Sequence, residues 1–158
     1  MKISDKGLEL IKKFEGFRDE PYLCSAGVPT IGYGTTRYPN GAKVKLADPQ
    51  ITHVRAKEFL LHDVEQFEKD VTQLIGATVL TQNQFDALVC LAYNIGSDID
   101  LDDIAEGLGD STLLKKVKKN PIDPTIEAEF GKWVYAKGRK VNGLIARRKS
   151  EAELWKSK

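Results

Sequence analysis

Residues 80–96, LTQNQFDALVCLAYNIG, predict a helix that is apolar on nearly every side. Thr81 and Gln84 form a capping-box pattern at its start, and Gly96 supplies a stop at its end. A helix without a polar face is stable only when other elements surround it. We therefore expect this helix to be the centre of a helical core, with Cys90 as one of its small apolar residues.

Apolar residues at helical spacing predict further helices on both sides of this core helix. From about Pro21 to about Leu46, between the helices expected at 4–14 and about 52–75, glycine, proline, aromatic and β-branched residues are concentrated. This composition predicts a small β-region of two or three short strands. The longest helix, of about 24 residues, would extend over about 36 Å and could connect two lobes. The expected helices are residues 4–14, about 52–75, 111–119, 124–136 and 143–156.

The chain has 158 residues, of which 41% are apolar and 30% are charged, a balance typical of a soluble globular domain. We expect one domain of the α+β class that is mainly helical. Its small N-terminal β lobe would comprise about residues 16–50. Its helical lobe would comprise about residues 76–158 together with the helix at 4–14, and the helix at about 52–75 would connect the lobes. A cleft between two such lobes is a common place for a substrate.

The charged residues are unevenly distributed, although the net charge is only +1. Residues 97–110 hold six acids and no base, whereas residues 111–158 hold 13 Lys and Arg against 5 Asp and Glu. The C-terminal third therefore predicts a cationic surface, which is either a solvated face or a site for an acidic polymer, nucleic acid or anionic lipid. The acidic segment is expected to be an exposed insertion, and it lacks the glycine and terminal glutamate of a calcium-binding loop.

Several classes of protein are not expected. No apolar run is long enough for a membrane helix, and residues 1–16 are charged where a signal peptide is apolar, so we expect synthesis in the cytoplasm without stable membrane insertion. Cys24 and Cys90 match no zinc spacing and are too few for a disulfide scaffold. The basic run at 147–149 is too short to indicate nucleic-acid binding. No exposed heptad pattern of apolar residues indicates a dimer, so we expect a monomer.

Glu15 is the first candidate for a chemical role. It lies near the expected end of the first helix, where unpaired carbonyl groups concentrate partial negative charge and disfavour a carboxylate. Phe14 and Phe17 could help to dehydrate it, and a carboxyl group that keeps its proton suits the general acid of glycosidic bond hydrolysis. Taken alone, however, Glu15 is more simply explained as a surface glutamate at a helix end.

Glu15 does not stand alone, because the pattern is Glu15, eight residues, Cys24, five residues, Thr30 and then IGYGTT. This pattern resembles the catalytic signature of glycoside hydrolase family 24, the phage-type lysozymes or endolysins, in the variety that has cysteine at the middle position. Three further segments are similar to later parts of that family, in the same order: LTQNQFDALVCLAYNIG, STLLKKV and EFGKWVYAKGRKVNGLIARRKSEAELW. The resemblance covers nearly the whole chain, apart from the acidic residues 97–110.

The resemblance implies a lysozyme-like two-lobed fold around a substrate cleft. It also implies hydrolysis of the β-1,4 bond between N-acetylmuramic acid and N-acetylglucosamine in peptidoglycan, without a cofactor or metal. Glu15 would be the proton donor, Cys24 would occupy the nucleophile or base position, and Thr30 would help to hold Cys24 or the attacking water. A thiol with a pKa of about 8.5 is mostly protonated at neutral pH. Two routes therefore stay open, attack by the sulfur and activation or positioning of water.

Two other functions remain open from the residues themselves. Cys24 with His53 or His62 could be the nucleophile and base of a hydrolase that cleaves wall peptides. The basic C-terminal third could instead belong to a non-catalytic module that binds the wall. Asp19 and Glu20 are alternative carboxylates, although their position just before a proline is more typical of a charged turn.

The family also implies a biological setting, in which a phage or prophage protein is made in the host cytoplasm and lyses the host cell. Without an export segment, such a protein would need a separate holin-like protein that permeabilises the membrane before it could reach the wall.

Overall fold

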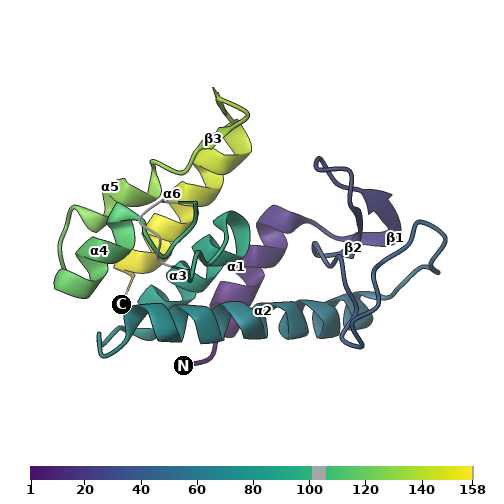
Figure 1. Cartoon of the computed structure of the whole chain (residues 1–158), viewed down its shortest axis with the longest axis horizontal. Coiled ribbons are helices and arrows are strands. Elements are labelled where there is room, and N and C mark those ends of the chain that lie inside the picture. Colours follow the sequence, from purple (N-terminus) through teal and green to yellow (C-terminus); the bar gives the residue numbers. More distant parts are fainter. Residues whose placement is uncertain (101–105, 158) are drawn as a thin grey trace. The chain divides into compact units, whose positions relative to one another are not determined.

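The computed structural model describes residues 1–100 and 106–157 (Figure 1). This part of the chain is mainly helical, and its strands form two small antiparallel sheets, β1 with β2 and β3 with β4. The predicted α+β, mainly helical class is therefore confirmed. The elements, in chain order, are α1 (Asp5–Glu15), β1 (Arg18–Leu23), β2 (Pro29–Gly32), α2 (His53–Ile75), α3 (Gln82–Ile95), α4 (Thr112–Lys119), α5 (Ile126–Phe130), β3 (Tyr135–Ala136), β4 (Arg139–Lys140) and α6 (Asn142–Lys156).

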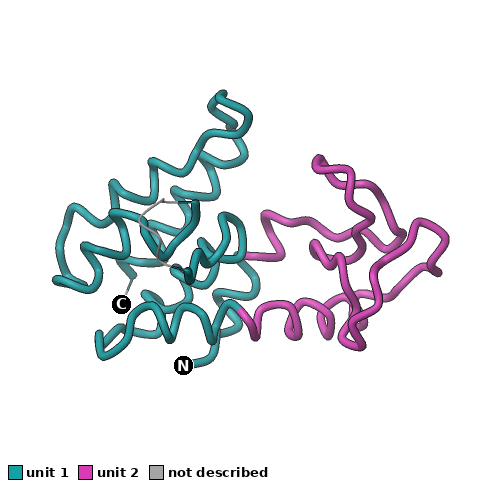
Figure 2. The backbone as a smooth tube through the Cα atoms, viewed as in Figure 1, with its two compact units in different colours: residues 1–10, 67–158 teal, residues 11–66 magenta. Residues whose placement is uncertain are grey.

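The backbone divides into two compact units (Figure 2). Unit 1 consists of residues 1–10 and 67–158, and unit 2 consists of residues 11–66. The helices α1 and α2 each contribute residues to both units, because the boundaries fall inside these helices. Among the described helices, none is both long enough and apolar enough to cross a membrane.

The helix α3 is the centre of unit 1. All of its residues from Gln84 to Ala92 are buried, and the side chain of Phe85 has no exposed surface. The predicted capping box is present, since the Gln84 amide donates to Thr81 Oγ1 (3.2 Å) and the Thr81 amide donates to Gln84 Oε1 (3.0 Å). The helix α6 packs against α3, and α5 packs against α6. The prediction of a central helix that other elements enclose is therefore confirmed.

The helix α6 carries three charged side chains into the interior of unit 1. Arg147 Nε lies 3.1 Å from Glu151 Oε1, and Arg148 Nε lies 2.9 Å from Glu151 Oε2. Two further donors are used, since Arg148 Nη2 donates to Asn94 Oδ1 (2.9 Å) and Arg147 Nη2 donates to the carbonyl of Cys90 (3.3 Å). Among the described residues, the buried Arg148 Nη1 has no hydrogen-bond partner. All three charged side chains are at most 4% exposed. They are part of the core of this unit.

The expectation that the C-terminal third is a cationic surface is therefore wrong for Arg147 and Arg148. The reason is that a buried carboxylate compensates much of the cost of burying two guanidinium groups. Other cations of this region are paired with an acid, because Lys116 and Lys132 both lie 2.7 Å from the carboxylate of the buried Glu129. The positive charge that faces water is smaller than the sequence suggests.

Two predicted segments differ from the structure in extent. The helix expected at 124–136 is only α5, which ends at Phe130 before Gly131, and the chain then turns back through the β3–β4 hairpin at Lys137 (φ 50°) and Gly138 (φ 74°). The acidic insertion expected to be exposed is partly buried, because Leu108 has no exposed surface and Asp110 is 7% exposed. Its residues 101–105 lie outside the described residues.

The buried carboxyl group of α6 predicts a pH-dependent stability. Burial raises the pKa of Glu151 from 4.5 to about 7, although Arg148 and Arg147 oppose this shift. The folded protein therefore holds this proton more tightly than the unfolded chain does, and the corresponding stability is lost as the pH rises from about 4.5 to about 7. Relative to Glu151→Gln, the free energy of unfolding of the wild type should fall by about 3 kcal/mol across this window, as measured by denaturant unfolding.

Glu153→Gln is the matched control, because Glu153 lies on the same helix but is exposed. Its difference from the wild type should stay nearly constant with pH. A pH-independent difference between wild type and Glu151→Gln would contradict the assigned shift.

Candidate active site

Glu15 is the last residue of α1, and its side chain is half-buried. The helix ends there because Gly16 has a φ of +70°, a conformation that glycine adopts without a steric penalty. The next residue, Phe17, stacks on the imidazole of His53 with ring centroids 3.7 Å apart, and it also contacts Tyr33 at 5.6 Å. These aromatic contacts within unit 2 fix the backbone immediately after Glu15.

Cys24 begins the tight turn of the β1–β2 hairpin. Its amide donates to the carbonyl of Val28 (3.0 Å), and its carbonyl accepts from the amide of Gly27 (2.8 Å), which has a φ of +74°. The side chain of Cys24 is partly exposed, and the thiol is free. The turn therefore holds the sulfur at a defined position while leaving it accessible to a reactant.

Thr30 lies on β2 directly opposite Tyr22 on β1, and its side chain is only 2% exposed. Directly opposed residues of an antiparallel pair project on the same face of the sheet. Cys24 follows Tyr22 by two residues, which is the spacing of side chains on one face of a strand. The hairpin thus gathers Tyr22, Cys24 and Thr30 on one face.

The pKa of Cys24 is lowered, chiefly because the backbone amides of Val28 and Ala26 donate hydrogen bonds to its sulfur. Partial burial acts in the opposite direction, and the hydroxyl of Thr30 lowers the pKa further. Amide and hydroxyl donors stabilise the thiolate relative to the thiol. Cys90 behaves in the opposite way, because burial in α3 raises the pKa of its thiol well above the ordinary value.

The hydroxyl of Thr30 can adapt to the protonation state of Cys24. Thr30 Oγ1 donates to the carbonyl of Val28 at 2.8 Å, and a hydroxyl has only one hydrogen to donate. When Cys24 is a thiol, Thr30 can accept from its S–H while it donates to Val28. When Cys24 is a thiolate, the hydroxyl hydrogen can turn towards the sulfur. Both protonation states therefore find hydrogen-bond partners at this position.

Tyr22 links Glu15 electrostatically to the hairpin. The pKa of Tyr22 is raised, first by partial burial and then by the negative charge of Glu15, with a smaller contribution from Cys24. The guanidinium of Arg18 opposes the shift from 4.6 Å above the ring of Tyr22. The charges of Glu15 and Cys24 therefore both act on the phenol of Tyr22. The structure brings the Thr30 hydroxyl to the Cys24 sulfur, and the charge of Glu15 acts on Tyr22 of the same hairpin.

The segment IGYGTT connects the hairpin with α2. Gly32 has a φ of +66°, and a Cβ atom at this position would lie 3.2 Å from the Cβ of Ala56 in α2. Thr35, which is 1% exposed, donates to Asp63 Oδ2 at 2.6 Å. The glycine therefore permits close packing of β2 on the helix, and the hydrogen bond attaches the following loop to α2. Both contacts support the strand that carries Thr30.

The alternative site residues have structural contacts elsewhere. Asp19 accepts a hydrogen bond from the side chain of Gln50, and its carbonyl accepts from the amide of Ile51 (2.9 Å). His53 stacks on Phe17, and His62 lies 3.8 Å from Asp63. In the described ranges the structure gives Cys24 no contact with either histidine, which leaves a cysteine–histidine pair without geometric support.

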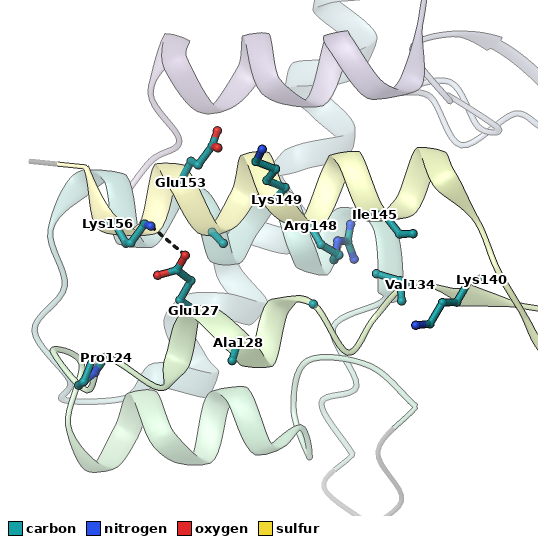
Figure 3. A pocket seen from close by; sticks show the side chains of 12 residues that line it. Pro124, Glu127, Ala128, Val134, Lys140, Ile145, Arg148, Lys149, Glu153 and Lys156 are labelled. Carbon is teal, nitrogen blue, oxygen red and sulfur yellow. Dashed lines mark hydrogen bonds and ion pairs between the residues drawn. The ribbon is translucent and has the colours of Figure 1, made fainter.

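Two cavities lie outside this group of residues. One of about 650 Å³ in unit 1 lies between α5 and α6, with Ala128 and Arg148 among its lining residues (Figure 3). Another of about 500 Å³ in unit 2 is lined by Tyr38 and Phe59, among others. Neither cavity includes Glu15, Cys24 or Thr30. Within residues 1–100 and 106–157, no group of three or more His, Cys, Asp or Glu side chains is arranged to hold a metal ion.

Tyr22 is not among the site residues expected from the sequence, although its position two residues before Cys24 in a strand is a signal for a shared face. The contact of Arg18 with Tyr22 and the irregular register between these two residues could not be predicted from residue spacing. A β-bulge adds a residue to one strand and so changes which side chains face each other.

The effect of the Thr30 hydroxyl on the pKa of Cys24 predicts a change in thiol reactivity. Thr30→Val keeps the side-chain volume but removes the hydroxyl donor, so the pKa of Cys24 should rise. The rate of alkylation by iodoacetamide, measured against pH by mass spectrometry, should then reach its midpoint at a higher pH than in the wild type. Cys24→Ala is the control and should show no fast alkylation, because Cys90 is buried. An unchanged midpoint in Thr30→Val would show that the hydroxyl does not act on the sulfur.

Known proteins similar to this chain identify its family and its fold. The chain matches the Phage lysozyme family model over residues 12–151. The endolysin of Acyrthosiphon pisum secondary endosymbiont phage 1 is 40% identical over 164 residues, which cover 99% of this chain and 99% of the relative. The endolysins of Bacillus phages B103 and PZA are longer proteins, and this chain spans 54% and 56% of their lengths.

Solved structures show the same relationship. The endolysin from Escherichia coli O157:H7 phage FAHEc1 superposes with a TM-score of 0.82 at 42% identity, covering 99% of this chain and 94% of the other. The muramidase domain of SpmX from Asticaccaulis excentricus superposes with a TM-score of 0.81 at 33% identity, with 99% of both chains covered. The lysozyme-like fold expected from the sequence is therefore confirmed, and the chain belongs to the phage lysozyme family.

Proposed function

We propose that this protein is a muramidase endolysin that hydrolyses the β-1,4 bond between N-acetylmuramic acid and N-acetylglucosamine in bacterial peptidoglycan. The observation that carries this proposal is a carboxyl group, Glu15, at a helix end near a hairpin that holds the Cys24 sulfur towards its ionised form. Glycosidic bond hydrolysis requires an acid on one side of the bond and a nucleophile or base on the other. The names of the relatives, endolysin and muramidase, agree with this chemistry.

In the proposed reaction Glu15 is the proton donor. The bond between the anomeric carbon and the glycosidic oxygen breaks as positive charge develops on the sugar ring, and the leaving oxygen takes the proton of Glu15. Because the side chain is half-buried, this proton is partly shielded from bulk water. The carboxylate that remains can then accept a proton from the water that completes hydrolysis.

Cys24 occupies the second catalytic position. The amides of Val28 and Ala26 and the hydroxyl of Thr30 stabilise its thiolate. A thiolate is a good nucleophile and a weaker base than its reactivity suggests, so it can bond to the anomeric carbon and later be displaced by water. In the other route the thiolate orients the water that attacks directly and takes up its proton. The first route retains the anomeric configuration and the second inverts it, so NMR of the first product before mutarotation distinguishes them.

Thr30 is the positioning residue in this proposal. Its buried hydroxyl holds the sulfur of Cys24 or the attacking water, and it is held in turn by the carbonyl of Val28. The wall-peptide hydrolase that the sequence left open has no corresponding support, because His53 and His62 have other partners. The alternative of a non-catalytic wall-binding module loses support, because Arg147 and Arg148 are buried in unit 1 and cannot contribute positive charge to a binding surface.

Replacing Glu15 tests the proposal most simply. Glu15→Gln keeps the shape of the side chain but removes the transferable proton, so the rate of peptidoglycan hydrolysis should fall by about 100- to 10,000-fold. The measurement is the release of reducing sugars from purified peptidoglycan, with a pull-down assay for binding to insoluble wall. Binding should persist. Glu20→Gln is the matched control, because Glu20 is exposed on β1. Hydrolysis at the wild-type rate by Glu15→Gln would defeat the assignment.

The proposal includes the route to the wall. The protein would be made in the host cytoplasm, act as a monomer and depend on a separate holin-like protein to permeabilise the membrane. Cytoplasmic expression in a Gram-negative laboratory host should then leave cells intact until chloroform permeabilises the membrane, when turbidity should drop rapidly. Cells that express Glu15→Gln are the control and should stay turbid after chloroform. Lysis of wild-type cultures without any permeabilising agent would contradict this dependence.

A further inference from the structure

The hydroxyl of Tyr22 is a polar group of the candidate active site to which the proposed mechanism gives no role. Among residues 1–100 and 106–157, the structure gives this hydroxyl no hydrogen-bond partner, and the side chain is half-buried. Tyr38 in the same unit differs, because its hydroxyl donates to Asp48 Oδ2 at 2.8 Å. A partly buried phenol usually uses its hydroxyl. The Tyr22 hydroxyl is therefore available to a substrate.

The hairpin fixes the direction of this side chain. Tyr22 lies opposite Thr30 in the register of β1 and β2, so both side chains project on the face that also carries Cys24. The register between β1 and β2 is irregular between Arg18 and Tyr22. Irregularities of this kind re-aim side chains and are common beside active sites. The aromatic ring thus lies on the reactive side of the hairpin.

Arg18 holds the ring in place. Its guanidinium carbon lies 4.6 Å from the centroid of the Tyr22 ring, a distance at which a cation and an aromatic face attract each other. This contact restrains the ring without using the hydroxyl. The positive charge of Arg18 also partly balances the negative charges of Glu15 and Cys24, which both act on the phenol.

We propose that Tyr22 is a further catalytic residue, whose hydroxyl donates a hydrogen bond to an oxygen of the sugar held between Glu15 and Cys24. The inference rests on the proposed muramidase function and deepens it. Because Tyr22 projects on the same face of the hairpin as Cys24 and Thr30, a sugar held against the Cys24 sulfur lies on the side of the hairpin that carries the phenol. Partial burial, followed by the charges of Glu15 and Cys24, raises the pKa of Tyr22 above its ordinary value, so the phenol keeps its proton near neutral pH. Tyr22 therefore acts as a neutral donor throughout the cycle.

The first test is kinetic. Tyr22→Phe removes only the hydroxyl, and it should lower kcat for purified peptidoglycan by about 10- to 100-fold, as expected for one lost donor to the reacting sugar. Its midpoint of thermal unfolding and its binding to insoluble wall should match the wild type. Tyr38→Phe is the matched control, since it removes a hydroxyl that bonds to Asp48 and should leave kcat unchanged.

The second test is spectroscopic and independent of activity. In protein labelled with ¹³Cζ-tyrosine, the pKa of Tyr22 measured by NMR should fall in Glu15→Gln and in Cys24→Ala, because each substitution removes a negative charge beside the phenol. The signal of Tyr135, an exposed tyrosine of unit 1, should not move. Absence of either shift would show that Glu15 or Cys24 does not lie beside the phenol, and it would overturn the inference.

The outcomes separate this inference from the proposed function. If wild-type protein releases no reducing sugars, the muramidase proposal itself fails. If the wild type is active and Glu15→Gln is inactive but Tyr22→Phe keeps kcat within twofold, only the role of Tyr22 is refuted. Equal losses of kcat in Tyr22→Phe and Tyr38→Phe would also refute it. A selective loss of kcat in Tyr22→Phe, together with both NMR shifts, supports it.

Discussion

The hydrogen bonds around the Cys24 sulfur are the interactions on which the proposed chemistry depends. Without them a partly exposed thiol would be mostly protonated at neutral pH and a poor catalytic group. The amides of Val28 and Ala26 come from the hairpin turn, and the hydroxyl of Thr30 comes from the strand that follows. The geometry of this turn and the register of β1 and β2 therefore determine how readily the Cys24 thiol ionises.

The same hairpin explains why Tyr22, Cys24 and Thr30 lie together. The register of β1 and β2 sets Tyr22 opposite Thr30, while the turn brings the backbone of Val28 to Cys24. Gly32 lets β2 approach α2 closely, and Thr35 ties the next loop to Asp63. The glycine-rich character of this segment thus serves close packing and tight turns in unit 2. The spacing of the catalytic pattern is a consequence of this local geometry.

Much of this arrangement could be predicted from the sequence. The central helix followed from its capping box and apolar composition, and the family resemblance gave the fold and the candidate residues. Glu15 was also expected near a helix end, because Gly16 follows it directly. These features depend on local sequence, which determines caps, turns and periodicity.

Features that depend on tertiary packing could not be predicted. Arg147 and Arg148 are charged and were expected at the surface, yet α6 buries both beside Glu151. The helix α5 is short because the chain turns back in the β3–β4 hairpin at Lys137 and Gly138. Helical periodicity in the sequence does not reveal this hairpin. The role proposed for Tyr22 depends on a register irregularity and on Arg18, and both require coordinates.

In the proposed reaction this site breaks the glycosidic bond on the reducing side of N-acetylmuramic acid. Digestion of purified peptidoglycan by the wild-type protein, followed by borohydride reduction and acid hydrolysis, is the most direct test. Muramitol should form in proportion to the loss of turbidity, without new amino groups. Formation of glucosaminitol in place of muramitol, or release of amino groups without new reducing ends, would contradict it.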